Sequence, residues 1–131
     1  MPGLDATGIV YYVSGTDRRS HIAVTTEVYG AEIEELVRRV VTRFNPLKVV
    51  LFGSRVRGTA GPDSDADVLV IMPVQRSRRE AATAIDVALI GIDLPVDVIV
   101  VTPEDVARDR NLPGSVVHEA LTEGKVLYER N

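Results

Sequence analysis

The sequence predicts an α/β fold in which helices cover a central β-sheet. Short β-branched apolar runs alternate with longer segments whose apolar residues recur at helical spacing, which is typical of strands and helices packed in layers. The chain has 131 residues, of which 45% are hydrophobic, so it can bury one core and has little room for a second. No repeat or linker divides the chain, and we therefore expect one compact domain.

The first 30 residues contain a predicted β-hairpin. Residues 9–13 (IVYYV) and 22–26 (IAVTT) are rich in β-forming residues, and a turn-prone, charged segment separates them. Because this hairpin precedes the main alternation, we interpret residues 1–30 as an N-terminal extension of a unit that spans residues 31–131.

A helix is expected from Ala31 to Phe44, because its apolar residues fall on one helical stripe and Asn45–Pro46 ends the pattern. Residues 47–52 and 67–72 are short and β-branched, which indicates two buried strands. The connection 53–66 is rich in glycine and proline. It has room for only a turn or two of helix and can return the chain antiparallel, so the predicted sheet is mixed.

The second half continues the alternation. Its expected elements are helix 78–90, strand 95–101, a short helix after Thr102–Pro103, helix 114–123 and an edge strand at 125–129. Ser77 and Glu80 form a capping-box pattern, and Gly91 and Gly124 are the expected C-terminal caps of the two longer helices. Thr102–Pro103 is typical of a helix start.

The composition limits the classes of function. The chain has no cysteine, which excludes disulfides, thiolate metal clusters and a cysteine nucleophile and fits a reducing compartment. We expect a soluble cytoplasmic protein, because no secretory leader and no apolar run of membrane-spanning length is recognisable. A formal charge of -4 argues against broad binding to nucleic acid.

Three aspartates form a candidate metal site. Asp65 and Asp67 stand at the start of a predicted strand, where a spacing of two sends both side chains to one face. Their charges repel each other unless a cation such as Mg²⁺ neutralises them. Asp97 lies in an apolar run that we expect to be buried, where an unpaired carboxylate would be costly. If the two strands are neighbours, the three acids can hold a pair of metal ions about 3.5–4 Å apart for phosphoryl or nucleotidyl transfer.

A phosphate site is expected on the turn before these acids. Gly53 lets the backbone approach a phosphate, and the hydroxyl of Ser54 adds a donor. Arg55 and Arg57 are close enough in sequence to reach a triphosphate, and guanidinium groups suit phosphate oxygens.

Other interpretations of these residues are open or excluded. The paired aspartates alone would also fit a solvated turn, and Asp93 competes with Asp97 for the place of the third acid. An EF-hand is excluded because Val68 occupies the loop position that needs glycine. A P-loop is excluded because Thr59 occupies the lysine position. Arg76, Arg78 and Arg79 are interpreted as a solvated helix start.

The segment GSRVRGTAGPDSDADVLV resembles the signature of the DNA polymerase β nucleotidyltransferase superfamily, namely Gly-Ser, ten residues and Asp-x-Asp. It is most similar to the minimal nucleotidyltransferases, over about residues 31–129. The resemblance implies a mixed sheet flanked by helices, Mg²⁺ held by the acids at 65, 67 and 97, and phosphates held around the glycine and serine at 53 and 54. It also implies transfer of a nucleoside monophosphate, commonly AMP from ATP, to an acceptor hydroxyl.

The resemblance extends to partners. Many minimal nucleotidyltransferases resemble antitoxins that inactivate a HEPN-type partner by adenylylating a tyrosine, so a nucleoside triphosphate and a HEPN-type protein are the expected partners. The alternative is a module that neutralises its partner by contact without catalysis. Exposed sheet edges leave a homodimer open. Two features depart from the family pattern: Ala66 replaces a larger aliphatic residue, and residues 1–30 have no recognised counterpart.

Overall fold

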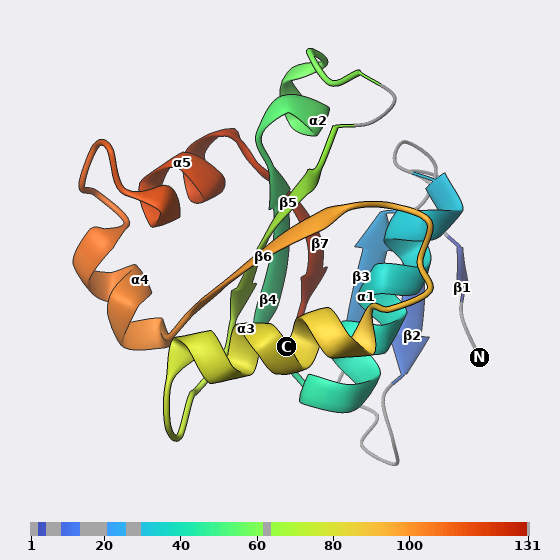
Figure 1. The fold of residues 1–131 in the computed structure, drawn as a ribbon, viewed down its shortest axis with the longest axis horizontal. Coiled ribbons are helices and arrows are strands. Elements are labelled where there is room, and N and C mark those ends of the chain that lie inside the picture. Colours follow the sequence, from blue (N-terminus) through green and yellow to red (C-terminus); the bar gives the residue numbers. More distant parts are fainter. Residues whose placement is uncertain (1–2, 5–8, 14–20, 26–29, 62–63, 131) are drawn as a thin grey trace.

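The computed structural model describes residues 3–4, 9–13, 21–25, 30–61 and 64–130. The elements are, in chain order, β1 (Gly3–Leu4), β2 (Ile9–Val13), β3 (His21–Thr25), α1 (Gly30–Phe44), β4 (Lys48–Phe52), α2 (Ser54–Arg57), β5 (Ala66–Ile71), α3 (Arg78–Ala88), β6 (Val96–Val101), α4 (Pro103–Asp109), α5 (Val116–Glu123) and β7 (Lys125–Glu129) (Figure 1). In the described part of the chain, no helix has the length and hydropathy needed to span a membrane.

The central sheet has four strands in the order β6-β5-β4-β7. Strand β4 is antiparallel to both of its neighbours, whereas β5 and β6 are parallel. The predicted mixed α/β sheet is therefore confirmed, as is the antiparallel return through the short helix α2. Strand β7 lies at one edge of this sheet, as the sequence predicts.

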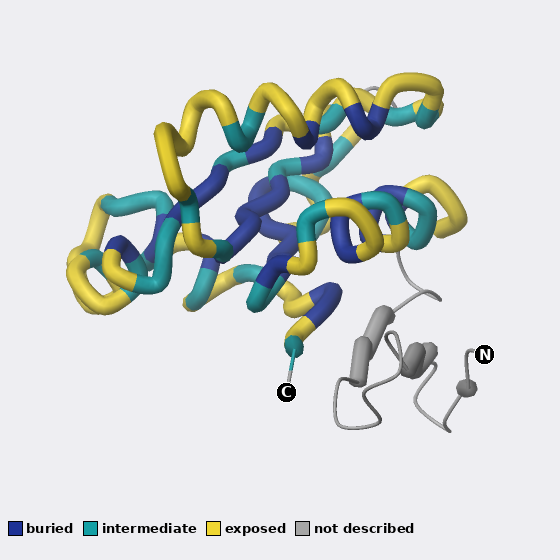
Figure 2. Tube along the Cα trace, turned by 90° about the horizontal axis from the view of Figure 1, so that it is seen from below, coloured by how far each residue is buried: buried dark blue, intermediate teal, exposed yellow. Residues whose placement is uncertain are grey.

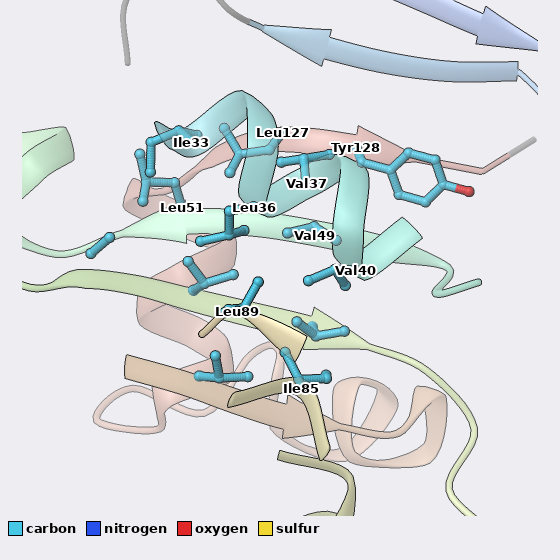
Figure 3. Packing of buried hydrophobic residues seen from close by; sticks show 14 of the residues in the cluster. Ile33, Leu36, Val37, Val40, Val49, Leu51, Ile85, Leu89, Leu127 and Tyr128 are labelled. Carbon is cyan, nitrogen blue, oxygen red and sulfur yellow. The ribbon is translucent and has the colours of Figure 1, made fainter. Parts of the chain in front are cut away.

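Helices cover both faces of the sheet and form two apolar clusters. On one face, the stripe of α1 and the buried Ile85 of α3 pack on alternate residues of the strands, such as Val49 and Val68 (Figure 3). On the other face, Val117 and Ala120 of α5 pack on the intervening residues, such as Leu69. The buried chain therefore runs through a middle layer, and the outer turns of the helices are exposed (Figure 2).

A second sheet contains β1, β2 and β3. Strands β2 and β3 pair antiparallel, with Ile9 opposite Thr25, which confirms the predicted hairpin strands. The connecting residues 14–20 lie outside the described residues. Strand β1 was not expected from the sequence, and β3 lies beside β7 of the central sheet (Figure 1). The division of the chain at residue 30 stays a prediction.

Candidate active site

The candidate site lies at the edge of the sheet where β4 ends and the parallel strands β5 and β6 begin. Asp67 is the register partner of Phe52 on β4 and of Asp97 on β6. Leu69 and Ile71 stand two and four residues after Asp67 on β5 and therefore point to the same face of the sheet. Both belong to the apolar cluster beneath α5. Because side chains alternate along a strand, Asp67 and Asp97 belong to the sheet face that α5 covers, and Asp65 stands one residue before β5. The expectation that the strand of Asp97 lies beside that of Asp67 is confirmed.

The absence of a side chain at Gly53 leaves room for a neighbouring carboxylate. Its φ of 81° lies in the left-handed region, which glycine adopts without steric cost. A Cβ added at Gly53 would overlap the Asp67 carboxylate, with Oδ2 as its nearest atom. The carboxylate therefore occupies space that any other residue at position 53 would fill.

The surroundings of Asp67 raise the pKa of its carboxyl group. Burial raises the pKa of Asp67, and the negative charges of Asp97, Asp65 and Glu119 raise it further, while Arg57 opposes them. Two of these acids were expected from the sequence. Glu119 was not, because α5 brings it to the site from a distant part of the chain and no local pattern marks it.

Asp97 is exposed, and the expectation that it is buried among apolar residues is wrong. It is the second residue of β6, an edge strand of the central sheet, and its side chain projects near the strand's beginning. Asp86 of α3, also exposed, lies within its electrostatic range, since burial and the charge of Asp97 raise the pKa of Asp86. Asp97 therefore belongs to an acidic surface instead of a buried pocket.

The donor chemistry of the site fits Mg²⁺. Burial is the main cause of the raised pKa of Asp67, and repulsion from the carboxylates of Asp97 and Asp65 adds to it. Among the described residues, no three acids or histidines are arranged closely enough to hold a metal ion together. Mg²⁺ is usually held by one or two carboxylates together with substrate phosphates, so a complete protein cage is not required.

Side chains of the predicted phosphate site have partners in the protein. The Nε and Nη2 groups of Arg55 donate to the carbonyl oxygen of Ser64, at 3.2 and 2.7 Å. Arg57 forms ion pairs with Glu119 and Glu123 of α5, at 3.4 and 3.5 Å. Both guanidinium groups thus stabilise the loop and its contact with α5.

A hollow of about 340 Å³ adjoins the site beside α5. Its lining residues are Arg57, Gly114, Ser115, His118, Glu119, Thr122 and Glu123. Two of them, Arg57 and Glu119, also affect the pKa of Asp67, so the hollow and the carboxylates belong to one surface. The Ser115 hydroxyl caps α5, since it accepts from the backbone N–H of His118.

Comparison with known proteins identifies a family from the sequence and a similar fold from the structure. Residues 33–127 match the family model described as nucleotidyltransferase domain. A candidate nucleotidyltransferase from Sulfolobus solfataricus has a similar fold, with a TM-score of 0.51 and 22% identity over 72% of this chain and 75% of that one. No curated protein matches the chain in sequence.

Two solved toxin-antitoxin assemblies also resemble the chain at lower TM-scores. One is a toxin-antitoxin structure with AMP-PNP, at a TM-score of 0.46 and 26% identity, covering 75% of this chain and 71% of that one. The other is a mutant of the toxin-antitoxin MntA-HpeT, at 0.49 and 23%, covering 76% and 73%.

Proposed function

This chain belongs to the nucleotidyltransferase domain family, and we propose that it transfers AMP from ATP to an acceptor hydroxyl in a Mg²⁺-dependent reaction. The observation that carries the proposal is the register of β5 and β6, which pairs Asp67 with Asp97 beside the side-chain-free Gly53. Carboxylates on one face and an open backbone turn are the parts that a triphosphate and its cation require.

The reaction exchanges one phosphate bond for another. The acceptor oxygen forms a bond to the α-phosphorus of ATP, the bond from that phosphorus to the bridging oxygen breaks, and pyrophosphate leaves. Asp97, which is exposed and therefore reachable by an acceptor, takes the proton of the attacking hydroxyl. Asp67, with Asp65 and Asp97 beside it, would hold Mg²⁺ together with the substrate phosphates, and the metal would supply positive charge to offset the charge that develops in the reaction.

The turn after β4 holds the triphosphate in this proposal. Gly53 lets phosphate oxygens approach the backbone, and the partly buried Ser54 supplies a hydroxyl donor. Arg57 is the better of the two arginine candidates, because its ion pairs are long and exposed and therefore weak. Arg55 would have to leave the carbonyl of Ser64 before it could reach a phosphate.

Two measurements with α-labelled ATP, Mg²⁺ and the acceptor test the proposed transfer: the release of pyrophosphate and the transfer of label to the acceptor. Asp67→Asn should abolish both pyrophosphate release and label transfer while leaving the folded structure intact. Asp93→Asn is the matched control, because Asp93 is an exposed acid that precedes β6, and it should retain activity. Undiminished transfer by Asp67→Asn would refute the site assignment.

For the acceptor, we propose a tyrosine hydroxyl of a HEPN-type protein partner, on the basis of the resemblance of the Gly-Ser and Asp-x-Asp segment to minimal nucleotidyltransferases. Mass spectrometry of the partner after co-expression with this chain should show additions of whole AMP groups. These additions should be lost with Asp67→Asn.

A second candidate function is neutralisation of the partner by contact alone. The lack of a ready three-acid metal group among the described residues favours it. A tight complex whose partner keeps its unmodified mass, with Asp67→Asn neutralising as well as the wild type, would select contact over catalysis.

A further inference from the structure

A second polar hollow lies at the opposite edge of the sheet from the candidate active site. It has a volume of about 570 Å³, and its charged lining residues are Arg76, Arg78, Arg79, Asp105 and Arg108. Val74 and Thr102, which also line it, follow the carboxyl ends of the parallel strands β5 and β6, whereas Asp67 and Asp97 stand near their beginnings. A six-residue strand spans about 20 Å, so this arginine hollow is separate from the catalytic carboxylates.

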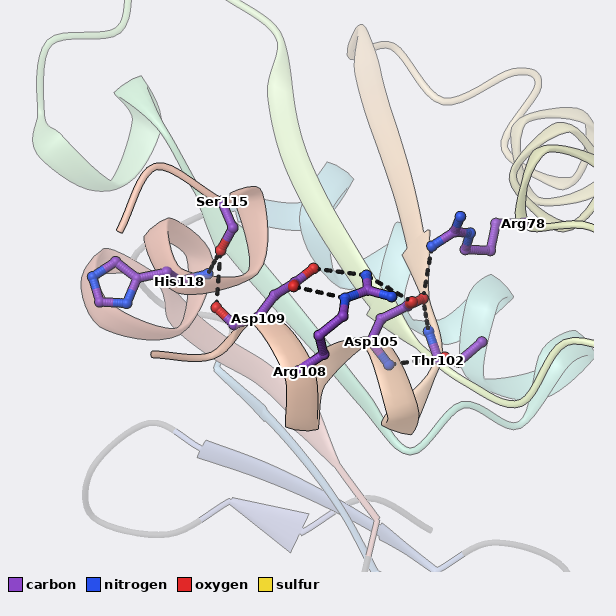
Figure 4. A network of polar contacts seen from close by, with 7 residues as sticks. All are labelled: Arg78, Thr102, Asp105, Arg108, Asp109, Ser115 and His118. Atoms are coloured by element: carbon purple, nitrogen blue, oxygen red, sulfur yellow. Dashed lines mark hydrogen bonds and ion pairs between the residues drawn. The ribbon is translucent and has the colours of Figure 1, made fainter. Parts of the chain in front are cut away.

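A buried carboxylate organises two of the four arginines. Asp105, which is only 6% exposed, pairs with Nη1 of Arg78 at 3.0 Å and with Nη2 of Arg108 at 3.1 Å (Figure 4). Its Oδ2 also accepts from the backbone N–H of Thr102 at 2.9 Å. The carboxylate therefore ties together guanidinium groups from α3 and α4, two helices that are joined in sequence only through β6.

The other two arginines, Arg76 and Arg79, form no polar contact within the described structure. Arg76 and Arg79 are exposed, and neither forms a hydrogen bond or ion pair with another described residue. The four guanidinium groups face two carboxylates, Asp105 and Asp109, which leaves a formal surplus of two positive charges on a chain of net charge -4. Concentrating positive charge in this way is costly unless an anion compensates it.

The size and charge of the hollow indicate a compact anion. Its volume falls within the range of small-molecule sites, about 300–1,000 Å³. A single carboxylate would leave positive charge unbalanced, whereas each phosphate group brings about one to two negative charges and three acceptor oxygens. Guanidinium forks bind such oxygens in pairs.

We propose that the arginine hollow binds a small anion with two or more linked phosphate groups. Arg76 and Arg79 supply the free charges, and Arg78 and Arg108 are positioned by Asp105 to complete the array. The N-terminal backbone groups of the adjoining helices are already capped by Ser77 and Thr102, so the binding rests on the arginine side chains.

Calorimetric titration of the full chain with inorganic tripolyphosphate, without divalent metal, tests the proposal. Binding should be saturable, and Arg76→Gln/Arg79→Gln should weaken it by about tenfold or more, as the loss of charge-assisted hydrogen bonds predicts. Arg43→Gln removes an exposed arginine at the end of α1 and should leave the affinity unchanged. The melting temperatures of both variants should match the wild type, because none of these exposed side chains forms a hydrogen bond or ion pair with a described residue.

The same titration separates this site from the proposed catalytic site. Asp67→Asn should bind tripolyphosphate as the wild type does, even if it transfers no nucleotide; loss of binding there would overturn the proposal. Equal affinity in the Arg76→Gln/Arg79→Gln variant would overturn it as well. Hexaglutamate or a single-stranded RNA that binds more tightly than tripolyphosphate, through the same arginines, would reassign the surface to an acidic protein or a nucleic acid and refute a phosphate site.

Discussion

At the residue scale, the candidate active site depends on a close approach between Gly53 and Asp67. The backbone at Gly53 turns with a positive φ, and its α-carbon lies where a side chain would displace the Asp67 carboxylate. The sequence predicted a glycine that brings backbone near phosphate. The structure adds that the same glycine makes room for a carboxylate, which only the pairing of β4 with β5 could reveal.

Gly53→Ala should therefore damage both stability and activity. The left-handed backbone and the overlap with Asp67 together should lower the free energy of unfolding by about 2–4 kcal/mol. A carboxylate moved by about 1 Å should reduce nucleotidyl transfer by about a hundredfold. Chemical denaturation and α-labelled ATP transfer measure the two effects.

Gly58→Ala is the matched control for this substitution. Gly58 has a φ of 77°, but nothing lies within 4 Å of the Cβ that alanine would add. It should lose about 1 kcal/mol from the backbone conformation alone and keep full activity. If the two variants lose the same stability and keep the same activity, the contact between Gly53 and the Asp67 carboxylate is not needed for function.

Asp67→Asn should stabilise the protein when divalent metal is removed. Burial and the neighbouring acids raise the pKa of Asp67, so the folded state holds this proton more tightly than the unfolded state does. The resulting stability is present at low pH and is lost as pH rises through the folded pKa, so ionised Asp67 destabilises the fold at neutral pH. The gain should be within about 1 kcal/mol, since water screens these charges.

Thermal melting in EDTA between pH 4 and pH 8 measures this effect. The advantage of Asp67→Asn should be present at neutral pH and should shrink toward the acid end. Added Mg²⁺ should raise the melting temperature of the wild type more than that of the variant. A variant less stable than the wild type at every pH would show that Asp67 stabilises the fold through contacts that outweigh repulsion.

At the element scale, apolar period and turn residues were sufficient to predict helix α1 and the strands of the central sheet, although not strand β1. The predicted helix 31–44 and the strands of the central sheet match α1, β4, β5, β6 and β7 to within one or two residues at each end. Helix α3 ends at Ala88, and its C-cap is Leu89 instead of the predicted Gly91. Gly91 has a positive φ but lies two residues after the cap. The C-cap residue Leu89 is buried against the core, a tertiary contact that the glycine pattern does not encode.

Exposure and side-chain partners were not predictable from the local pattern. The apolar run around Asp97 suggested a covered strand, but the cover depends on which helices pack over each end of β6. Arg55 and Arg57 were assigned to phosphate by sequence proximity, whereas the loop and α5 supply their partners in the structure. The positions of the strands could therefore be inferred, and the charges around them could not.

The capping box of α4 gives a prediction with a defined pH dependence. The backbone N–H of Thr102 lowers the pKa of Asp105, with burial opposing it and Arg78 assisting it. A lowered pKa means that this stabilisation is present above the unfolded pKa and is lost as pH falls through the folded pKa. Asp105→Asn should therefore cost about 1–2 kcal/mol at neutral pH, through the weakened cap and the unpaired arginines.

Denaturant unfolding of Asp105→Asn at pH 7 and at pH 3 measures the change. The difference from the wild type should narrow at the lower pH, because the stabilisation from ionised Asp105 is lost as pH falls through the folded pKa. Glu104→Gln is the control, since Glu104 is an exposed acid in the same helical turn. An equal and pH-independent loss in both variants would mean that the network around Asp105 adds nothing beyond the helix cap.

At the scale of the whole molecule, the sheet separates opposite charges. The beginnings of β5 and β6 carry the aspartates of the candidate active site, and arginines surround the ends of the same strands. A net charge of -4 conceals this separation, because it sums the charges over the whole chain. Because a six-residue strand spans about 20 Å, substitutions at one site should act independently of the other.

We expect residues 30–131 to contain a complete folded unit. Residues 33–128 supply the two apolar clusters through which α1, α3 and α5 pack on both faces of the central sheet. A fragment of residues 30–131 should therefore unfold cooperatively and bind Mg²⁺-ATP with the affinity of the full chain. Denaturant unfolding and calorimetry check the two properties.

The fragment also tests what β3 contributes beside β7. Its removal uncovers the edge strand β7, where Val126 is already 44% exposed, and uncovered edges pair with other chains. We expect the fragment to self-associate more than the full chain in size-exclusion chromatography, and Val126→Lys to reverse that association without altering nucleotide binding. A fragment that fails to unfold cooperatively even with Val126→Lys would instead make residues 1–29 part of the same folded unit, and the boundary at residue 30 would be wrong.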